Sequence, residues 1–407
     1  MTQTQSYTFG FLLEQTLGHR THSQNLQANV PKDPTVRPIW GPIEWNLTGL
    51  AAHIPVYNSN WTVRAGLRAR QALRRIQRQT PLHALFVHTQ VPAVLLADWM
   101  QRIPTVVSLD ATPQQYDALG DHYAHEQGPR WLERIKWRAN VRALQRAQGI
   151  VAWSQWTKAG LIDAYRIPAD KIVVIPPGVN SWEWTRDTPR QQANMPQNEP
   201  VKILFVGGDL QRKGGHLLLE AFRVLRQEQA LLGNVVELHL VTRDPVFAEP
   251  GLFGYYNMQP NSAPLKALFH GCDIFCLPTY GDCLPMVLSE AGAAELPLIA
   301  TNVAGIGEIV KDGETGFLIP TGDISALTNA LRTLIANPAL RFTQGRQAAT
   351  LVQQEFDAER NTERLLALLK QYAVTKVTNT MWLPAWQKPA TRQSMQGLTP
   401  PLVEKAR

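Results

Sequence analysis

Short apolar runs rich in Val, Ile and Leu alternate with longer amphipathic stretches over almost the whole 407-residue chain. Such runs are typical of strands in a parallel sheet that is buried on both faces, and the stretches between them have the helical period. The pattern therefore predicts an α/β fold built from βαβ units. The predicted strands are 7–13, 53–57, 83–88, 105–109, 149–153, 171–176, 201–207, 235–241, 254–258, 272–278, 296–301 and 316–320.

The chain is too long for a single core, and a polar segment rich in Pro, Asn and Gln separates the strands into two sets. We predict two Rossmann-like domains, each a doubly wound parallel sheet, that face a central cleft. Ligands of such folds bind at the carboxyl ends of the strands. The expected boundaries are an N-terminal domain at 1–180, a linker at 181–200, a C-terminal domain at 201–372 and an irregular tail at 373–407, which can dock back on the N-terminal domain through its tryptophans.

Composition narrows the class of protein further. A chain with 44% hydrophobic and 18% charged residues is neither disordered nor fibrous. Cys272, Cys276 and Cys283 are too few and too clustered for a disulfide framework, so we expect buried thiols in a reducing compartment; a metal site with His270 is the alternative. Since no apolar stretch is long enough to span a membrane and the first residues lack signal-peptide features, we expect a cytoplasmic protein, soluble or peripheral.

The segment "ILFVGGDLQRKGGHLLLEAF" has the pattern of a strand, a glycine-containing loop and an amphipathic helix. Backbone N–H groups near Gly207 and Gly208, with the cations Arg212 and Lys213, can bind a phosphate group there. The loop lacks the Gly-Lys-Ser/Thr ending of a P-loop. The alternative is an ordinary turn whose two cations face solvent.

A second signal lies about seventy residues further on, where Asp282 follows a strand and Glu290 lies in the next predicted helix among apolar neighbours. A buried carboxylate needs a partner, and ligand hydroxyls would serve. The helix N-terminus, with the amides of Cys283, Leu284 and Met286, favours an anionic group. The alternatives are Asp282 as a helix cap and Glu290 as a solvated helix residue.

Together these motifs resemble glycosyltransferase family 4, over residues 168–356, including "IPPGVN" and "AGIGEIVKDGETGFLIPTGD". The resemblance implies a GT-B fold and a retaining hexosyltransferase of cell-envelope or polysaccharide biosynthesis. It implies a UDP- or GDP-hexose donor, a glycan or lipid-linked acceptor, and no other cofactor. It also implies no metal, and the sequence has no Asp-x-Asp motif, the signature of metal-dependent transferases.

The resemblance also implies roles for individual residues. Asp282 and Glu290 align with the family's Glu-x7-Glu pair, which implies contacts to the donor sugar hydroxyls and to the ribose; the first member is one methylene shorter here. Lys213 matches the family's diphosphate-binding lysine. The family's arginine position is Gly208, which leaves Arg212 as the substitute cation, and Glu308 matches a position near the donor.

The first domain resembles the family in outline only. Gly18 and His19 are the nearest match to a loop that approaches the donor phosphates, and Thr21 can cap the helix that follows. Asp110 stands where the family has a histidine near the transferred sugar; it either binds a hydroxyl there or caps the turn at 111–113. His88, at a strand end, is either an acceptor-binding residue of the cleft or a satisfied structural histidine. We expect Asp110, Arg212, Lys213 and Asp282 to carry the catalysis.

The net charge of +7 belongs entirely to the first 185 residues, which hold 19 Lys and Arg against 12 Asp and Glu. One amphipathic helical pattern there contains six arginines: Arg64, Arg68, Arg70, Arg74, Arg75 and Arg78. Such a helix either contacts an anionic membrane or acceptor, or is a solvated face. Nucleic acid is disfavoured because no stacking aromatics are interleaved with the cations.

Two other functions compete with glycosyl transfer. One is a GT-B phosphorylase or epimerase, although no phosphorylase cofactor-lysine motif is present. The other is a non-catalytic nucleotide-sugar or membrane-binding GT-B module, which the departures at Gly208, Asp282 and Asp110 make conceivable. Release of nucleoside diphosphate from a bound donor would separate an enzyme from such a module.

Overall fold

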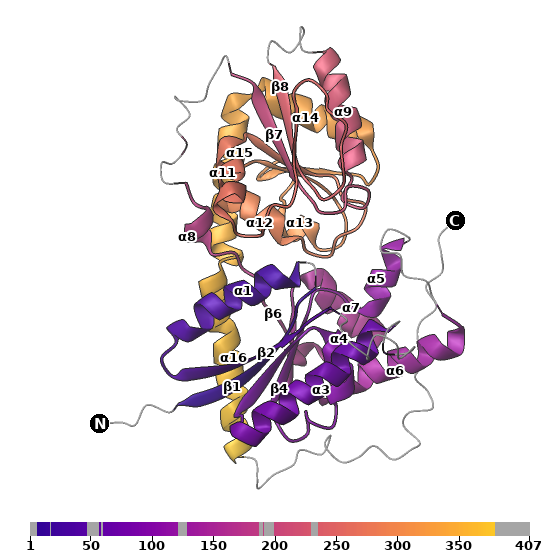
Figure 1. Cartoon of the computed structure of the whole chain (residues 1–407), viewed down its shortest axis with the longest axis vertical. Helices are drawn as coiled ribbons and strands as arrows, with labels where there is room; N and C mark the ends of the chain where they lie inside the picture. Colours follow the sequence, from indigo (N-terminus) through magenta and orange to yellow (C-terminus); the bar gives the residue numbers. More distant parts are fainter. Residues whose placement is uncertain are drawn as a thin grey trace. The chain divides into compact units, whose positions relative to one another are not determined.

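The computed structural model describes residues 6–16, 18–46, 57, 60–120, 128–186, 190, 199–228 and 235–378, and it contains two compact units (Figure 1). Unit 1 comprises residues 1–115, 126–175 and 362–407, and unit 2 comprises residues 116–125 and 176–361. Each unit contains a six-stranded sheet in which all paired strands are parallel. The predicted α/β class with two Rossmann-like sheets is confirmed.

In unit 1 the strand order is β2-β1-β3-β4-β5-β6. The strands are β1 (Tyr7–Glu14), β2 (Val36–Ile43), β3 (Ala84–His88), β4 (Thr105–Leu109), β5 (Gly149–Ala152) and β6 (Ile172–Val174). The helices along this part of the chain are α1 (His19–Asn29), α3 (Trp61–Gln79), α4 (Gln90–Ala93), α5 (Pro113–Ala118), α6 (Arg130–Arg146) and α7 (Gln155–Tyr165), with short 3-10 turns at Val30–Lys32, Val94–Leu96 and Ala169–Lys171. The strand predicted at 53–57 falls almost entirely outside the described residues.

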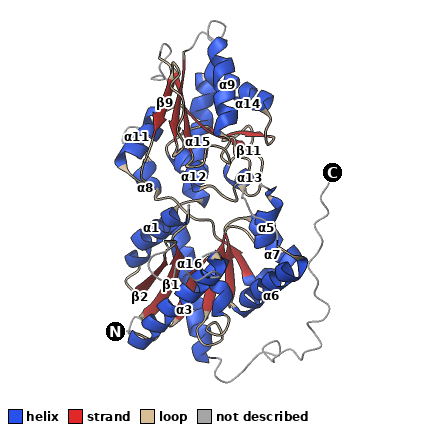
Figure 2. Ribbon diagram, turned by 45° about the vertical axis from the view of Figure 1, so that its right-hand side comes forward, coloured by secondary structure: helices blue, strands red, loops and turns tan. Residues whose placement is uncertain are grey.

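Both faces of this sheet are covered by helices (Figure 2). Leu85 and Val87 of β3 pack into a core with residues of α3, α6 and α7, whereas Phe86 packs on the opposite face with Phe9 and Phe11 of β1. Successive side chains of a strand point to opposite faces, so a strand buried on both faces needs apolar residues at consecutive positions. This explains the unbroken apolar runs in the sequence.

The last helix, α16 (Ala358–Thr378), differs from the expected domain boundary. From residue 362 onward it belongs to unit 1, whereas the sequence placed residues up to 372 in the C-terminal domain. Leu365, Leu366 and Leu369 explain the difference, because they follow a helical period and are buried against the β1 and β3 phenylalanines. Of the predicted tail, residues 373–378 continue this helix, and the two tryptophans expected to dock the tail lie outside the described residues.

In unit 2 the strand order is β12-β11-β10-β7-β8-β9. The strands are β7 (Val201–Val206), β8 (Val236–Val241), β9 (Leu252–Tyr255), β10 (Ile274–Leu277), β11 (Leu298–Thr301) and β12 (Gly316–Ile319). The helices are α8 (Ser181–Trp184), α9 (Gly215–Gln227), α11 (Ala263–Gly271), α12 (Met286–Ala293), α13 (Ile306–Ile309), α14 (Ile324–Ala336) and α15 (Pro338–Glu355). Part of the expected linker is therefore structured: Trp184 of α8 is buried, with its ring 5.0 Å from that of Phe269.

Within the described ranges, none of the helices combines the length and the apolar character that a membrane-spanning segment requires.

Candidate functional site

The site predicted in the second half of the chain forms at one edge of the unit 2 sheet. Strand β7 lies between β10 and β8, and all three are parallel. The loops that follow these strands therefore meet at their carboxyl ends, which is where open α/β folds bind ligands. The loop at 207–214 and the loop at 278–285 bring Arg212 and Lys213 into contact with Asp282.

A glycine fixes the path of the loop after β7. Gly214 has a φ of +73°, and a Cβ atom there would lie 1.9 Å from the carbonyl oxygen of Pro278, so no other residue fits. Two aspartates hold the rest of the loop: Asp244 accepts a hydrogen bond from the Leu210 amide at 2.6 Å, and Asp209 accepts one from the Arg212 amide at 2.9 Å. Helix α9 begins directly after Gly214.

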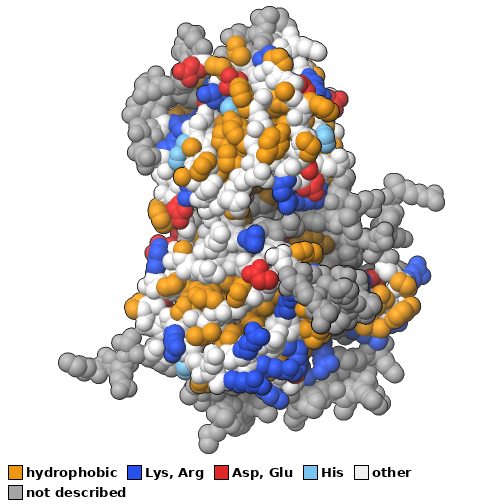
Figure 3. Space-filling view, in the orientation of Figure 1, with side chains coloured by type: hydrophobic (Ala, Val, Ile, Leu, Met, Phe, Trp, Pro, Cys, Tyr) orange, Lys and Arg blue, Asp and Glu red, His pale blue; other side chains and the backbone are white. Residues whose placement is uncertain are grey.

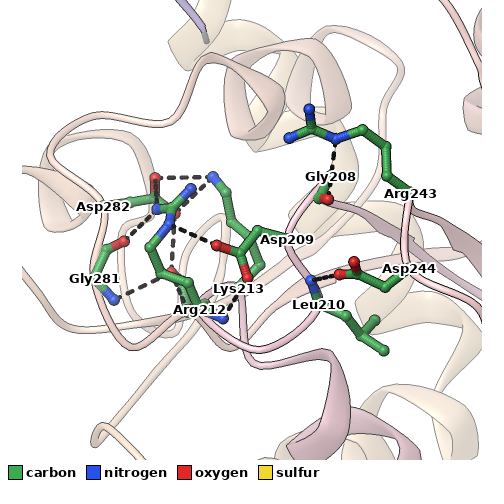
Figure 4. Close-up of polar contacts among 10 residues, drawn as sticks. Gly208, Asp209, Leu210, Arg212, Lys213, Arg243, Asp244, Gly281 and Asp282 are labelled. Atoms are coloured by element: carbon green, nitrogen blue, oxygen red, sulfur yellow. Dashed lines mark hydrogen bonds and ion pairs between the residues drawn. The ribbon is translucent and has the colours of Figure 1, made fainter. Parts of the chain in front are cut away.

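Asp282 is the centre of the polar cluster (Figure 4). Lys213 Nζ lies 2.8 and 2.7 Å from its two carboxylate oxygens, and Arg212 Nη1 lies 3.1 Å from Oδ1. Thr279 Oγ1 donates to Oδ2 at 2.9 Å. The Arg212 guanidinium also donates to the carbonyl of Gly281 at 2.7 Å. Two cations thus share one buried carboxylate, and the Arg212 Nε also lies 3.5 Å from the Asp209 carboxylate.

These contacts keep Asp282 ionised. Burial raises the pKa of its carboxyl, but the charges of Lys213 and Arg212, together with hydrogen bonds, outweigh burial and hold the pKa below its ordinary value. Asp282 does not cap α12, whose N-cap is Pro285. Arg212 and Lys213 are mostly buried, with side chains 14% exposed, so they are not solvated turn residues.

Glu290 is a buried carboxyl of a different kind. It lies in the middle of α12 and is 7% exposed. Among the described residues, none donates a hydrogen bond to its carboxylate. Burial raises the pKa of Glu290 to about 7, although the charge of Lys266 lowers it in part. A buried carboxylate without a hydrogen-bond donor readily accepts hydrogen bonds from hydroxyl groups of a ligand. Because Glu290 is buried, it is not a solvated helix residue, which was the alternative.

The other residues predicted near the donor surround this edge. Cys283 and Leu284 are buried just before α12, and Met286 is its first residue. Glu308 is half-buried in α13. The Gly305 amide donates to the Cys283 carbonyl at 2.9 Å and so joins the loop before α13 to the loop before α12.

The three cysteines are buried free thiols, as expected. Burial raises the pKa of Cys272 to about 12 and also raises that of Cys276, so both are protonated at neutral pH. Over the parts of the chain that the structure describes, no three His, Cys, Asp or Glu side chains are grouped as metal ligands.

In unit 1 the predicted residues also gather at the carboxyl ends of parallel strands. His88 ends β3, Asp110 follows β4, and His19 opens α1 just after β1. Gly18 is the N-cap of α1, without a side-chain cap bond, so the prediction that Thr21 caps this helix is wrong: Thr21 lies inside it. Asp110 is buried, and its carbonyl accepts a hydrogen bond from the Thr157 hydroxyl.

An aromatic and imidazole cluster forms around His88. Its Nε2 lies 2.9 Å from His19 Nδ1, and its ring stacks on Trp153 at 5.1 Å between centroids. The His22 ring meets it edge-on at 5.0 Å. Burial, with the neighbouring histidines, holds the pKa of His88 well below its ordinary value. His88 is therefore neutral at physiological pH.

The sequence interpretation missed Glu14 as well as His22 and Trp153. The buried Glu14 carboxylate accepts hydrogen bonds from Trp61 Nε1 at 2.7 Å, from Thr16 Oγ1 at 2.9 Å and from the Thr89 hydroxyl. Its position was a usable signal, because it is a carboxylate at the very end of an apolar strand. The contact brings the loop after β3 and the first turn of α3 to the end of β1.

The six arginines of α3 separate into two groups. Arg64 is buried, with its guanidinium 5.0 Å from the Trp61 ring; Arg68 donates to the Asn46 carbonyl at 2.7 Å, and Arg70 pairs with Asp98 at 2.6 Å. Arg74, Arg75 and Arg78 are exposed. Lys and Arg side chains gather on the face of unit 1 that carries α3 (Figure 3). Half of the predicted basic surface is therefore engaged within the fold.

Comparison with family models agrees with the geometry. Residues 28–182 match the model described as Glycosyltransferase Family 4, and residues 200–337 match that described as Glycosyl transferases group 1. The chain therefore contains a Glycosyltransferase Family 4 domain followed by a Glycosyl transferases group 1 domain. Its two sheets are those of the GT-B fold, which solved relatives share.

The similar proteins are named for different glycosyl-transfer reactions. The chain is 27% identical over 221 residues to a D-inositol 3-phosphate glycosyltransferase of an Arthrobacter species, covering 51% of this chain and 52% of that one. It is 26% identical over 310 residues to a glycogen synthase of Mycobacterium tuberculosis, covering 72% and 70%. The chain thus spans about half the length of the first curated relatives it matches.

Solved structures show the same fold. Sucrose-phosphate synthase from Thermosynechococcus elongatus matches with a TM-score of 0.71 at 17% identity, over 91% of this chain and 100% of that one. Anabaena HepE in complex with UDP-glucose matches with a TM-score of 0.63 at 18% identity, over 90% and 100%.

Proposed function

We propose that this chain is a retaining glycosyltransferase of family 4 that moves a hexose from a nucleoside-diphosphate sugar to a glycan or lipid-linked acceptor in envelope or polysaccharide synthesis. The observation that carries the proposal is the unit 2 cluster. Two cations held by Asp282 lie in the same unit as Glu290, a buried carboxyl free to accept hydroxyl groups. Cations suit a diphosphate, and the carboxylate suits a ribose.

In the proposed reaction the bond between the anomeric carbon and the diphosphate oxygen breaks, and its electron pair stays on the leaving phosphate. Lys213 and Arg212 stabilise the charge that develops there, and they do so more in the transition state than in the ground state. The acceptor hydroxyl attacks from the leaving-group face and its proton passes to the departing phosphate, so no protein nucleophile and no metal are required.

The histidine cluster of unit 1 supports a role on the sugar or acceptor side. His88 is neutral and fully buried, and its Nε2 contact with His19 Nδ1 can orient the half-buried His19 ring at this sheet edge. Asp110 lies at the end of the adjacent strand β4. An imidazole and a carboxylate at one sheet edge suit the hydroxyl groups of a sugar.

The membrane surface of the proposal fits α6 better than α3. Trp131 and Ile135 are 65% and 54% exposed, and the exposed Arg134, Arg138 and Arg142 lie on the same side of that helix. An aromatic and an aliphatic side chain flanked by cations suit the headgroup region of an anionic leaflet. Phosphatidylglycerol vesicles should sediment the protein, and replacing the two apolar residues by Ser should abolish this. Retention of sedimentation in that variant contradicts the assignment to α6.

A panel of UDP- and GDP-hexoses in a thermal-shift assay tests the donor class, because a ligand that binds the native state raises its apparent stability. We expect at least one to raise the melting temperature of the wild type, and neither Lys213→Ala nor Glu290→Ala to respond. Release of nucleoside diphosphate from that donor identifies an enzyme. Binding without release favours the non-catalytic module.

A further inference from the structure

An arginine from the loop after β8 fills the space above Gly208. Arg243 Nε donates to the Gly208 carbonyl at 3.1 Å. A Cβ atom built on Gly208 would lie 2.7 Å from this Nε and 2.9 Å from Nη2. Figure 4 shows the guanidinium over the glycine. A side chain at 208 and the Arg243 guanidinium therefore compete for one volume.

Gly208 is the position at which the resemblance in sequence implies an arginine on the donor diphosphate, and this chain has none there. Position 243 is 35 residues further along the chain, but β7 and β8 are paired, Val206 with Val241, so their following loops are neighbours. The Arg243 guanidinium thus lies beside position 208, where the resemblance implies an arginine side chain. The nearby Asp244 anchors this arrangement through its bond to the Leu210 amide.

Arg243 differs from the other two cations in its charge balance. Lys213 and Arg212 both contact Asp282, and Arg212 also lies near Asp209. Within the described part of the chain, Arg243 forms no ion pair, and only its Nε forms a hydrogen bond. The residue is exposed, so its Nη1 and Nη2 groups are available to an anion.

We propose that Arg243 binds the diphosphate of the donor in place of the arginine missing at 208, which makes it a further binding residue of the site. The inference rests on the proposed function. The carbonyl of Gly208 fixes Nε, and the two remaining amino groups form the fork that suits two phosphate oxygens. Arg212, tied to Asp282 and Gly281, then serves to orient the loop as well as to add charge.

The test is calorimetric titration of the full chain with UDP, GDP and ADP, each compared with its nucleoside. For the diphosphate that wild type binds, we expect Arg243→Gln to weaken affinity about tenfold or more, as for loss of a charged hydrogen bond, with nucleoside affinity unchanged. The matched control is Arg223→Gln, an exposed arginine of the same unit paired with Glu249, which should bind as wild type.

If the single variant loses structure, a double variant that moves the arginine from position 243 to position 208 provides a second test. Gly208→Arg combined with Arg243→Gly should restore most of the diphosphate affinity, because the guanidinium returns to the same volume from the other loop. Unchanged affinity in Arg243→Gln, with Lys213→Ala weakened, overturns the role of Arg243 and leaves the proposed function standing. Absence of diphosphate binding by the wild type overturns the proposed function itself.

Discussion

Replacing Glu290 by Gln should make the protein more stable, and the gain should grow with pH. The pKa of this carboxyl is about 7 in the fold, against an ordinary value of 4.5, because burial disfavours its charged form. A carboxyl whose pKa is raised by folding stabilises the native state fully below its unfolded pKa. That stability is lost as pH rises through the folded pKa. Gln has nearly the same shape and never ionises.

The two pKa values set the size of the effect. Each tenfold change in proton affinity corresponds to about 1.4 kcal/mol, so the ionisable carboxyl costs about 1 kcal/mol at pH 5 and about 3 kcal/mol at pH 8. The Gln variant does not lose this free energy of unfolding, because its side chain does not ionise. Its advantage over wild type should therefore increase by about 2 kcal/mol between these two pH values, whatever constant difference its amide introduces.

Urea denaturation of both proteins at pH 5, 6, 7 and 8, followed by tryptophan fluorescence, measures this difference directly. Glu355→Gln, at an exposed position near the end of α15, is the control and should show no pH-dependent gain. A Glu290→Gln difference that stays constant from pH 5 to pH 8 would contradict a raised pKa of the Glu290 carboxyl in the folded protein. The variant should meanwhile bind nucleotide more weakly, which would show that a residue retained for binding costs stability.

Three further predictions concern the scaffold. Gly214→Ala should cost at least about 2 kcal/mol of unfolding free energy, since its left-handed backbone and the carbonyl oxygen 1.9 Å from the Cβ position exclude a methyl group, whereas Gly18→Ala, with φ −63° and open space, should change it little. Leu369→Ala should lower the stability of unit 1 by about 3 kcal/mol in urea denaturation, and no loss would mean that α16 is not part of that core. The imidazole NMR signals of His88 and His22, whose pKa values are lowered by burial, should not titrate between pH 5 and pH 8; a midpoint in that range contradicts their burial as neutral groups.

The sequence predicted the strands that are buried on both faces, because an unbroken apolar run between two helical periods is typical of such a strand and of little else. It missed β2, whose Pro38, Gly41 and Pro42 are atypical of a strand. The structure explains them, since β2 lies at the edge of the sheet, where a residue without an N–H is tolerated. The position of α16 was also hidden, because helical periodicity gives the apolar side of a helix but not the sheet that it covers.

In the candidate site, too, the residues set by local sequence were predictable and those set by strand order were not. Lys213, Asp282 and Glu290 were predictable, because they come from motifs within one loop or one helix. Arg243 and the contact of Glu14 with Trp61 were not, because each depends on which strands are neighbours in the sheet. Local spacing reveals residues that act from one segment, whereas strand order determines which segments meet.

Donor turnover in a matched pair of proteins tests the proposed sugar transfer by the unit 2 cluster. Wild type and Lys213→Ala would be incubated with each of a set of UDP- and GDP-hexoses, and released nucleoside diphosphate would be quantified by chromatography. We expect release from at least one donor by the wild type and a loss of at least about 100-fold in the variant, as for removal of a group that stabilises transition-state charge. Equal release by both proteins, or none from any donor, would contradict the claim that this cluster transfers a sugar.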